Sequence, residues 1–258
     1  MKTKTLGFIG GGRITKIILQ AFQNQNVTFE KIVVTDTNQE VLNSLKKKFP
    51  DIIITDNLLE ATNNEVVFVA LHPPVFMETI GKVKDILNKN SIVVSLAPKL
   101  TIEKMNSVLP GFNNIARMNP SASAIVNKGV NPIAFAAEMS NDTKNQLLEL
   151  MKPLGSVPVV DESKIEAYAV ISAMGHTYYF FQFNKLKELA INFGMDEKEA
   201  QTAITEMLWG TTETLFNSGM VYNEVADLVP VKPLGKVEET IKGYYDQYLN
   251  GIFAKIKP

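Results

Sequence analysis

Three consecutive glycines near the start of the chain restrict its fold most strongly. They stand in "LGFIGGGRITKII", directly after a strand pattern and directly before a helical one. In this context glycine allows a tight turn and a close approach of the backbone to a pyrophosphate, whose charge the amino terminus of the helix favours. Gly10 and Gly12 match the dinucleotide fingerprint, whereas Thr15 takes its third position, where a branched side chain is expected to crowd the helix against the strand. We predict a dinucleotide-binding turn here, with a purely structural turn as the alternative.

Short apolar runs alternate with helical patterns through the first part of the chain. The runs include "KIVVTD", "NEVVFVAL" and "SIVVSLAP", and "SVPVVDES" is expected to be the last strand. Beyond it only helical patterns follow: Ser163 and Glu166 predict a capping box that opens a regular helix to Asn192, and Asp196 with Glu199 opens the next helix. These patterns predict an α/β fold, with an amino-terminal Rossmann-type doubly wound sheet in residues 1–160 and an all-α carboxy-terminal domain in residues 161–258.

Composition excludes several classes of function. The 258 residues carry a formal net charge of -1, which provides no basic field for a nucleic acid or an anionic membrane. Without cysteine there are no disulfides, thiolate metal sites or cysteine nucleophiles. His72 and His176 have no acidic partners at ligand spacing, so no metal is expected. The start of the chain lacks the pattern of a signal peptide, and a cytoplasmic protein is expected.

The end of the second strand carries the residue that favours one cofactor over the other. Asp36 follows this strand, where a carboxylate binds the adenosine ribose hydroxyls and repels a 2'-phosphate. We therefore favour NAD over NADP, although the Arg13 guanidinium in the glycine turn could reach such a phosphate. The alternative role for Asp36 is that of a turn residue at the end of a strand.

An apolar, aromatic stretch in the helical part, "ISAMGHTYYFF", holds one of the two histidines. On a regular helix, Ser172, His176 and Tyr179 project from nearly the same side. An imidazole exchanges protons near neutral pH, so we predict that His176 lies within reach of a substrate and serves as a proton donor, with Ser172 beside it. In the alternative, His176 bonds a carbonyl in a helical interface and the aromatic side chains belong to core and dimer packing.

Four segments, "GFIGGGRIT", "VVFVALHPPVF", "IARMNPSASAIVNKG" and "ISAMGHTYYFF", occur in the order and at the separations of the pyrroline-5-carboxylate reductase family, which the chain resembles over nearly its whole length. The resemblance implies an NAD(P)H-dependent oxidoreductase that reduces the C=N bond of a small cyclic imine or amino-acid-derived substrate, with proline biosynthesis as one possibility. It also implies a homodimer joined through the carboxy-terminal helices.

The family motifs are kept unevenly. Gly10, Gly12, Arg117, Pro120 and Gly129 match family positions in the cofactor half. Arg117 either reaches the ligand edge of the sheet or forms a salt bridge that fixes the following loop.

The helical half departs further from the family. Ser172, Gly175 and Tyr178 match, but Met174 and His176 replace a serine and a proline of the substrate segment, and a later threonine pair is missing. Lys232 and Lys236, in the region of that pair, could bind an anion with their ammonium groups.

Together these arguments predict three groups of site residues. The catalytic residues are His176 and Ser172. The substrate-binding residues are Ser121, Met174, Gly175, Lys232 and Lys236. The cofactor-binding residues are Gly10, Gly11, Gly12, Arg13, Ile14, Asp36, Leu71, His72, Pro73, Asn119 and Pro120. Two other functions remain open: a dehydrogenase of 3-hydroxyacids or other carbonyl compounds, and a non-catalytic dinucleotide-binding module that has lost its substrate pocket.

Overall fold

The chain forms two compact units in a computed structural model that describes residues 4–258, apart from the side chains of Pro73 and Pro74. The first unit runs to Met174 and also includes Ile252–Pro258, while the second is Gly175–Gly251. The compact units thus divide at Met174, and the domain boundary expected after residue 160 stays a prediction. The residues between these two positions belong with the sheet because they pack on it, as Ile165 does in its hydrophobic core.

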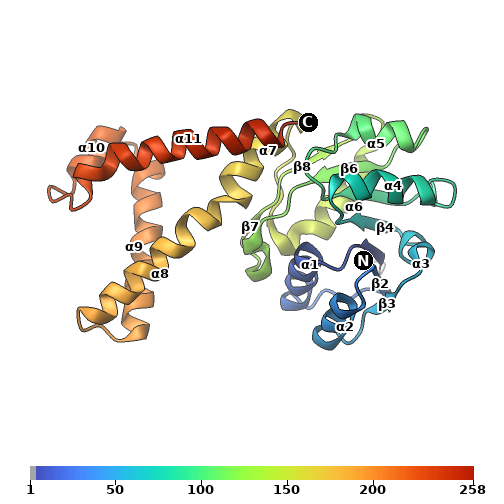
Figure 1. Cartoon of the computed structure of the whole chain (residues 1–258), viewed down its shortest axis with the longest axis horizontal. Helices are drawn as coiled ribbons and strands as arrows, with labels where there is room; N and C mark the ends of the chain where they lie inside the picture. The colour runs from blue at the N-terminus through green and yellow to red at the C-terminus, as the bar shows by residue number, and fades with distance from the viewer. Residues whose placement is uncertain (1–3) are drawn as a thin grey trace. The chain divides into compact units, whose positions relative to one another are not determined.

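The first unit contains a seven-stranded sheet with the order β3-β2-β1-β4-β5-β6-β8 (Figure 1). Its strands are β1 (Thr5–Ile9), β2 (Lys31–Thr35), β3 (Ile53–Thr55), β4 (Val66–Val69), β5 (Ile92–Ser95), β6 (Ile115–Met118) and β8 (Ile133–Phe135). The first six pair in parallel, and β8 adds an antiparallel edge. This order confirms the predicted doubly wound sheet, and in such sheets ligands bind where the strand order reverses, which here is between β1 and β4.

Two short strands stand outside this sheet. β7 (Gly129–Val130) pairs with β9 (Gly155–Ser156), and Val159 forms an isolated bridge with Ile133. The run predicted as the last strand therefore contributes only Ser156 to a regular strand and Val159 to an isolated bridge, and the edge strand β8 was not anticipated from the sequence.

Helices cover both faces of the sheet. One face packs against α1 (Arg13–Asn24), α2 (Gln39–Lys48) and α6 (Asn141–Met151). The other packs against α3 (Leu58–Thr62), α4 (Pro73–Val83) and α5 (Ile102–Val108). Two 3-10 segments, Ala122–Val126 and Lys152–Leu154, complete the connections on the first face.

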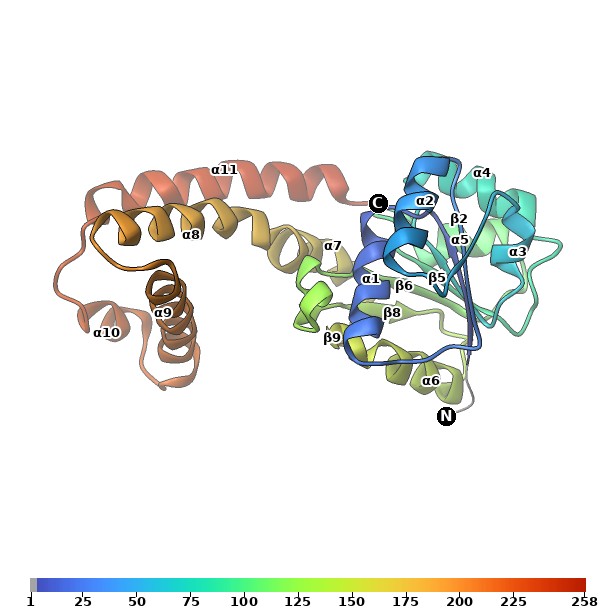
Figure 2. The same cartoon turned by 90° about the horizontal axis from the view of Figure 1, so that it is seen from below.

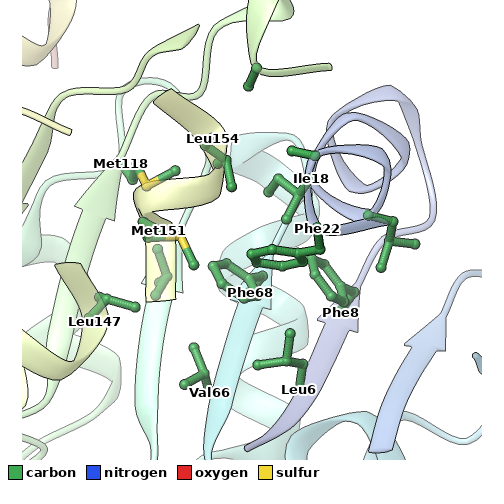
Figure 3. Packing of buried hydrophobic residues seen from close by; sticks show 14 of the residues in the cluster. Leu6, Phe8, Ile18, Phe22, Val66, Phe68, Met118, Leu147, Met151 and Leu154 are labelled. Atoms are coloured by element: carbon green, nitrogen blue, oxygen red, sulfur yellow. The ribbon is translucent and has the colours of Figure 1, made fainter. Parts of the chain in front are cut away.

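Large apolar side chains fill the first face, as Figure 3 shows for the residues that it labels. Phe8 and Phe68, from neighbouring strands, stack with ring centroids 4.8 Å apart, and Phe22 of α1 packs over them. All three are at least 98% buried. Burial of each such side chain contributes about 1.5–3 kcal/mol, so this packing holds the glycine turn, which links β1 to α1, in a fixed position.

The helix expected from Ser163 to Asn192 is interrupted. A 3-10 turn (Glu162–Lys164) leads into α7 (Ile165–Tyr168), a π-helical segment follows (Ala169–Ala173), and α8 (Gly175–Asn192) begins after Met174. The predicted capping box is wrong, because Asp161 caps this turn by accepting from the Ser163 amide at 2.9 Å. A π segment has a wider turn than an α-helix, so the spacing that predicted one shared side for Ser172, His176 and Tyr179 does not apply.

The second unit, Gly175–Gly251, contains helices only (Figure 2), and the structure describes all of this stretch. The helices are α8, α9 (Glu197–Asn217), α10 (Tyr222–Asp227) and most of α11 (Glu238–Ile256), which a 3-10 turn (Gly235–Val237) precedes. The predicted capping box of Asp196 and Glu199 is confirmed at the start of α9. Ala200 is the one buried apolar side chain between residues 175 and 251.

Candidate functional site

The glycine turn joins β1 to α1 at the carboxyl end of the sheet. Gly10 has a φ of 102°, a region that only glycine adopts readily, and its amide donates to the Thr35 carbonyl at 2.8 Å. A Cβ atom at Gly10 would lie 2.6 Å from the carbonyl oxygen of Ala70. Both the dihedral angle and the close approach of two backbones therefore require glycine at this position.

Thr15 closes the same turn from within α1. It is fully buried, and its hydroxyl donates to the Gly10 carbonyl at 2.5 Å. The expectation that a branched side chain here only crowds the helix was incomplete, since the hydroxyl satisfies a carbonyl of the turn. A sequence motif defined by three glycines does not predict this hydrogen bond.

The start of α1 is open to a ligand. A Cβ atom at Gly12 would meet no atom within 4 Å, and no side chain caps the first turn of the helix. Arg13 is exposed at the first helical position, and Ile14 is half-buried against the core. Backbone amides at the start of a twelve-residue helix, next to a guanidinium, can bind phosphate oxygens.

Asp36 lies beside this turn. Its carboxylate accepts from the Gly11 amide at 2.7 Å and from the Asn38 amide at 2.8 Å. The two roles proposed for Asp36, that of a turn residue and that of a ribose ligand, are thus compatible. Its carboxylate holds the turn, and each oxygen keeps a further lone pair for a ribose hydroxyl.

The loops that follow β4 and β6 begin at the same edge of the sheet. Leu71 is half-buried and His72 is exposed at the position before α4, which begins at Pro73. Asn119 and Pro120 follow β6, with the Asn119 amide donating to the Pro132 carbonyl at 3.1 Å. The first unit therefore brings the predicted cofactor residues to the carboxyl edges of β1, β2, β4 and β6, the edge at which ligands bind in such sheets.

A buried ion network underlies this edge. Arg117, at the end of β6, is 1% exposed and pairs with Glu166 of α7 and with Glu162 at 3.5 Å. Glu162 also accepts from the Ile102 amide at the start of α5. Of the two readings of Arg117, the salt bridge is confirmed, but it fixes α7 rather than the following loop. Glu166, predicted to reach back to its own helix, points into the protein instead.

A small cavity of about 20 Å³ adjoins this network. Among the described residues, Arg117 Nε and Asn119 Nδ2 are buried there without a hydrogen-bond partner. Such a cavity has room for one water molecule, which could accept from both groups.

The predicted substrate residues of the first unit differ in accessibility. Ser121 is 1% exposed, and its hydroxyl lies 2.9 Å from that of Ser123. Ser172 is half-buried in the π segment and donates to the Tyr168 carbonyl at 2.8 Å. Met174 is half-buried at the end of that segment, and its amide donates to the Ala169 carbonyl.

The remaining predicted residues belong to the second unit. Gly175 is buried at the start of α8, and His176 is half-buried with its ring stacked on Phe180 at 5.8 Å. Lys232 and Lys236 are exposed. The predicted site is therefore divided between the two units, with Ser172 in the first and His176 in the second.

Tyrosines gather around a groove of the second unit, between α8 and α11. Tyr178 meets Tyr245 edge-on at 6.1 Å, and Tyr244 and Tyr248 also line the groove. Partial burial raises the pKa of Tyr178 and of Tyr179 above the ordinary tyrosine value.

No set of three or more histidine, aspartate or glutamate residues within the described part of the chain could hold a metal ion. None of the helices in residues 4–258 is long and apolar enough to cross a membrane.

Comparisons with known proteins agree with this geometry. Residues 5–99 match a family model described as NADP oxidoreductase, coenzyme F420-dependent. The pyrroline-5-carboxylate reductase of Methanosarcina acetivorans is 24% identical over 98% of this chain and 93% of its own length. The enzyme of the same name from Haemophilus influenzae is 25% identical over 83% of this chain and 79% of its own length.

Solved structures extend the similarity to the whole chain. A pyrroline carboxylate reductase from Plasmodium falciparum with NADP bound has a TM-score of 0.83 at 16% identity, covering 100% of this chain and 98% of that one. A pyrroline-5-carboxylate reductase from Coxiella burnetii has a TM-score of 0.71 at 25% identity, covering 99% and 95%. The glycine turn, the strand order and relatives matched along nearly the full length lead to one conclusion: the chain is similar to pyrroline-5-carboxylate reductases over nearly its whole length.

Proposed function

We propose that the protein is an NAD(P)H-dependent reductase of the C=N bond of a small cyclic imine or amino-acid-derived substrate, for which pyrroline-5-carboxylate is the first compound to test. The observation that carries the proposal is the open glycine turn at the switch point of the sheet. Its amides at Gly12 and Arg13 are available to a pyrophosphate, and Asp36 adjoins them.

The chain itself has to bind the cofactor, orient the substrate, exclude water and provide a proton. When bound, the reduced nicotinamide supplies a hydride to the imine carbon. The substrate nitrogen needs a proton, and His176 is our candidate donor because its imidazole can exchange protons near neutral pH. The Ser172 hydroxyl, now bonded to a backbone carbonyl, would turn to the substrate by rotating about one bond.

We favour NAD as the cofactor. The Asp36 carboxylate would repel a 2'-phosphate at the ribose, and the residues that follow it, "TNQE", contain no cation to offset this repulsion. Arg13 is the group that would favour NADP, the dinucleotide found in the Plasmodium falciparum structure. Dissociation constants for NADH and NADPH measure the balance between these two side chains.

The protein is proposed to act as a homodimer joined through its helical units. Exposed apolar side chains support this proposal, among them Phe181 at 68%, Phe193 at 81% and Phe216 at 75%. Patches of this kind mark protein interfaces, and a stretch of four helices with one buried apolar side chain needs a partner surface to bury the others.

The direct test is turnover. Purified protein is mixed with NADH or NADPH and pyrroline-5-carboxylate, and then with other cyclic imines, while the absorbance of the reduced cofactor is followed. Turnover that His176→Ala lowers supports the proposal, and an unchanged rate contradicts the role of His176. Cofactor binding without turnover of any imine would favour a non-catalytic module, a reading that the replaced serine and proline at Met174 and His176 already suggest.

A further inference from the structure

The turn after β5 holds a lysine in an unfavourable backbone conformation. Lys99 has a φ of 65°, and it is one of three residues other than glycine with positive φ among residues 4–258. The other two, Asn26 and Asn127, are asparagines, which tolerate this region better than most residues do. For a lysine the left-handed conformation costs about 1–2 kcal/mol, so the surrounding structure must hold it.

Its neighbours show how the turn is held. Ala97 and Leu100, on either side of it, are at least 96% buried in the hydrophobic core. The Leu96 amide donates to Val69 of β4 at 3.0 Å, and Lys104 Nζ donates to the Lys99 carbonyl at 3.3 Å. With both sides fixed, the chain reverses at Lys99, whose side chain is exposed.

The turn places the exposed Lys99 at the edge of the sheet where ligands bind. β5 pairs with β4, with Ser95 opposite Val69, and both strands end at the carboxyl edge where ligands bind in such sheets. Lys99 thus follows β5 at the edge where His72 follows β4. It lies on the side of β1 opposite Asp36, which follows β2. A dinucleotide that extends from Asp36 across the glycine turn reaches the β4 and β5 side with its other half.

The Lys99 ammonium is uncommitted. No ion pair formed by the described residues includes it. Among the other cations near this edge, Arg117 is buried and paired with two glutamates, Arg13 lies in the glycine turn, and Lys104 Nζ donates to the Lys99 carbonyl. Lys99 therefore presents an exposed, unpaired positive charge on a strained backbone at this turn.

We infer that Lys99 is a ligand-binding residue that pairs with an anionic oxygen group, either the carboxylate of the substrate or a phosphate of the cofactor. The inference rests on the proposed function for the identity of these ligands. It adds a cation to a substrate site in which Met174 replaces one serine of the family motif and a later threonine pair is missing. Strain retained at a binding turn is a recognised arrangement, because the residue that binds best is not the residue that fits the backbone best.

The experiment compares three variants of Lys99 with one control. Lys99→Gly and Lys99→Asn remove the charge and suit the left-handed backbone, whereas Lys99→Arg keeps the charge. Asn26→Gly is the matched control, since it changes another positive-φ residue, at the opposite end of α1 from the glycine turn. For each protein we measure Tm, the KM for pyrroline-5-carboxylate, and calorimetric affinities for NADH, NADPH and L-proline, the product of that reduction.

We expect the uncharged variants to keep or gain thermal stability while they lose ligand affinity. Lys99→Gly and Lys99→Asn should keep or raise Tm, and should weaken binding of one anionic ligand about tenfold or more, as expected for the loss of a charged hydrogen bond. Lys99→Arg should retain most of the affinity, and Asn26→Gly should leave all affinities unchanged. A rise confined to the KM of the imine, or weaker L-proline binding, identifies a carboxylate; weaker NADH or NADPH binding identifies a phosphate.

Two outcomes overturn the inference. If Lys99→Asn matches the wild type in KM and in all three affinities, Lys99 is only a turn residue. If the wild type binds none of the ligands, both the inference and the proposed function fail. If the wild type binds them through Lys99 but reduces no imine, the inference stands and the proposed reaction does not.

Discussion

The ion pair of Arg117 and Glu166 offers the sharpest test of how the sheet edge is held. In the structure Arg117 is 1% exposed. Glu166→Ala would leave its guanidinium with Glu162, at 3.5 Å, as the remaining carboxylate partner. Removing one partner of a buried pair costs about 3–5 kcal/mol, because an uncompensated charge stays inside the protein. For a domain of this size each kcal/mol lowers Tm by about 2–4 °C, so Tm should fall by about 6–20 °C.

The double variant Arg117→Met/Glu166→Leu separates the charge from the packing. It removes both charges and fills their space with apolar side chains, which in buried pairs is often neutral or stabilising by about 1–4 kcal/mol. We therefore expect the double variant to be at least as stable as the wild type. Glu78→Gln, which breaks an ion pair with both side chains more than 60% exposed, is the control and should change stability by less than about 1 kcal/mol.

Urea unfolding followed by circular dichroism measures these differences at one fixed protein concentration, because a dimer's stability depends on concentration. The reasoning fails if Glu166→Ala unfolds within about 1 kcal/mol of the wild type. It also fails if the double variant is as unstable as the single one, since shape rather than charge would then hold α7 on the sheet.

Further predictions concern the turn, the cofactor, the dimer and pH. Gly10→Ala should lower Tm and weaken binding of both cofactors, because the φ of 102° and the close carbonyl exclude a methyl group; equal Tm would contradict this. Asp36→Asn should weaken NADH binding more than NADPH binding in titrations of cofactor fluorescence. Phe181→Glu should convert a dimer into monomers in light scattering, and a wild-type monomer would remove the proposed dimer. Because the folded state raises the pKa of Tyr178 and Tyr179, their contribution to stability is present below the ordinary tyrosine pKa and is lost as pH rises through the folded values; replacing both with Phe should flatten that decline in alkaline urea titrations.

The fold was largely predictable because its signals are local. The glycine turn, the alternation of strands and helices, and the Asp196 capping box each depend on residues within a few positions of one another, and the structure contains all three. The interrupted helix was not predictable in this way. The residues from Ser163 to Asn192 read as one continuous helical pattern, and nothing in it marks the π segment between Ala169 and Ala173.

The residues of the candidate site were likewise predictable only where their signals are local. Residue types predicted a cofactor edge, and the structure places Gly10, Gly12 and Asp36 at the expected ends of strands. Thr15 read as a defect of the motif until its hydroxyl was found on the Gly10 carbonyl. Lys99 was missed altogether, since only its backbone φ distinguishes it from an ordinary surface lysine.

What the sequence determined by itself is the order of elements, the dinucleotide turn and the kind of chemistry that its side chains can perform. Tertiary structure decided which partners those side chains took. Glu166 has a helix-capping position in the sequence, yet it pairs with Arg117, 49 residues away, because a buried guanidinium requires a carboxylate more strongly than an exposed helix amide does. Such choices depend on which groups burial removes from water, and burial is a property of the packed molecule rather than of any short stretch of its chain.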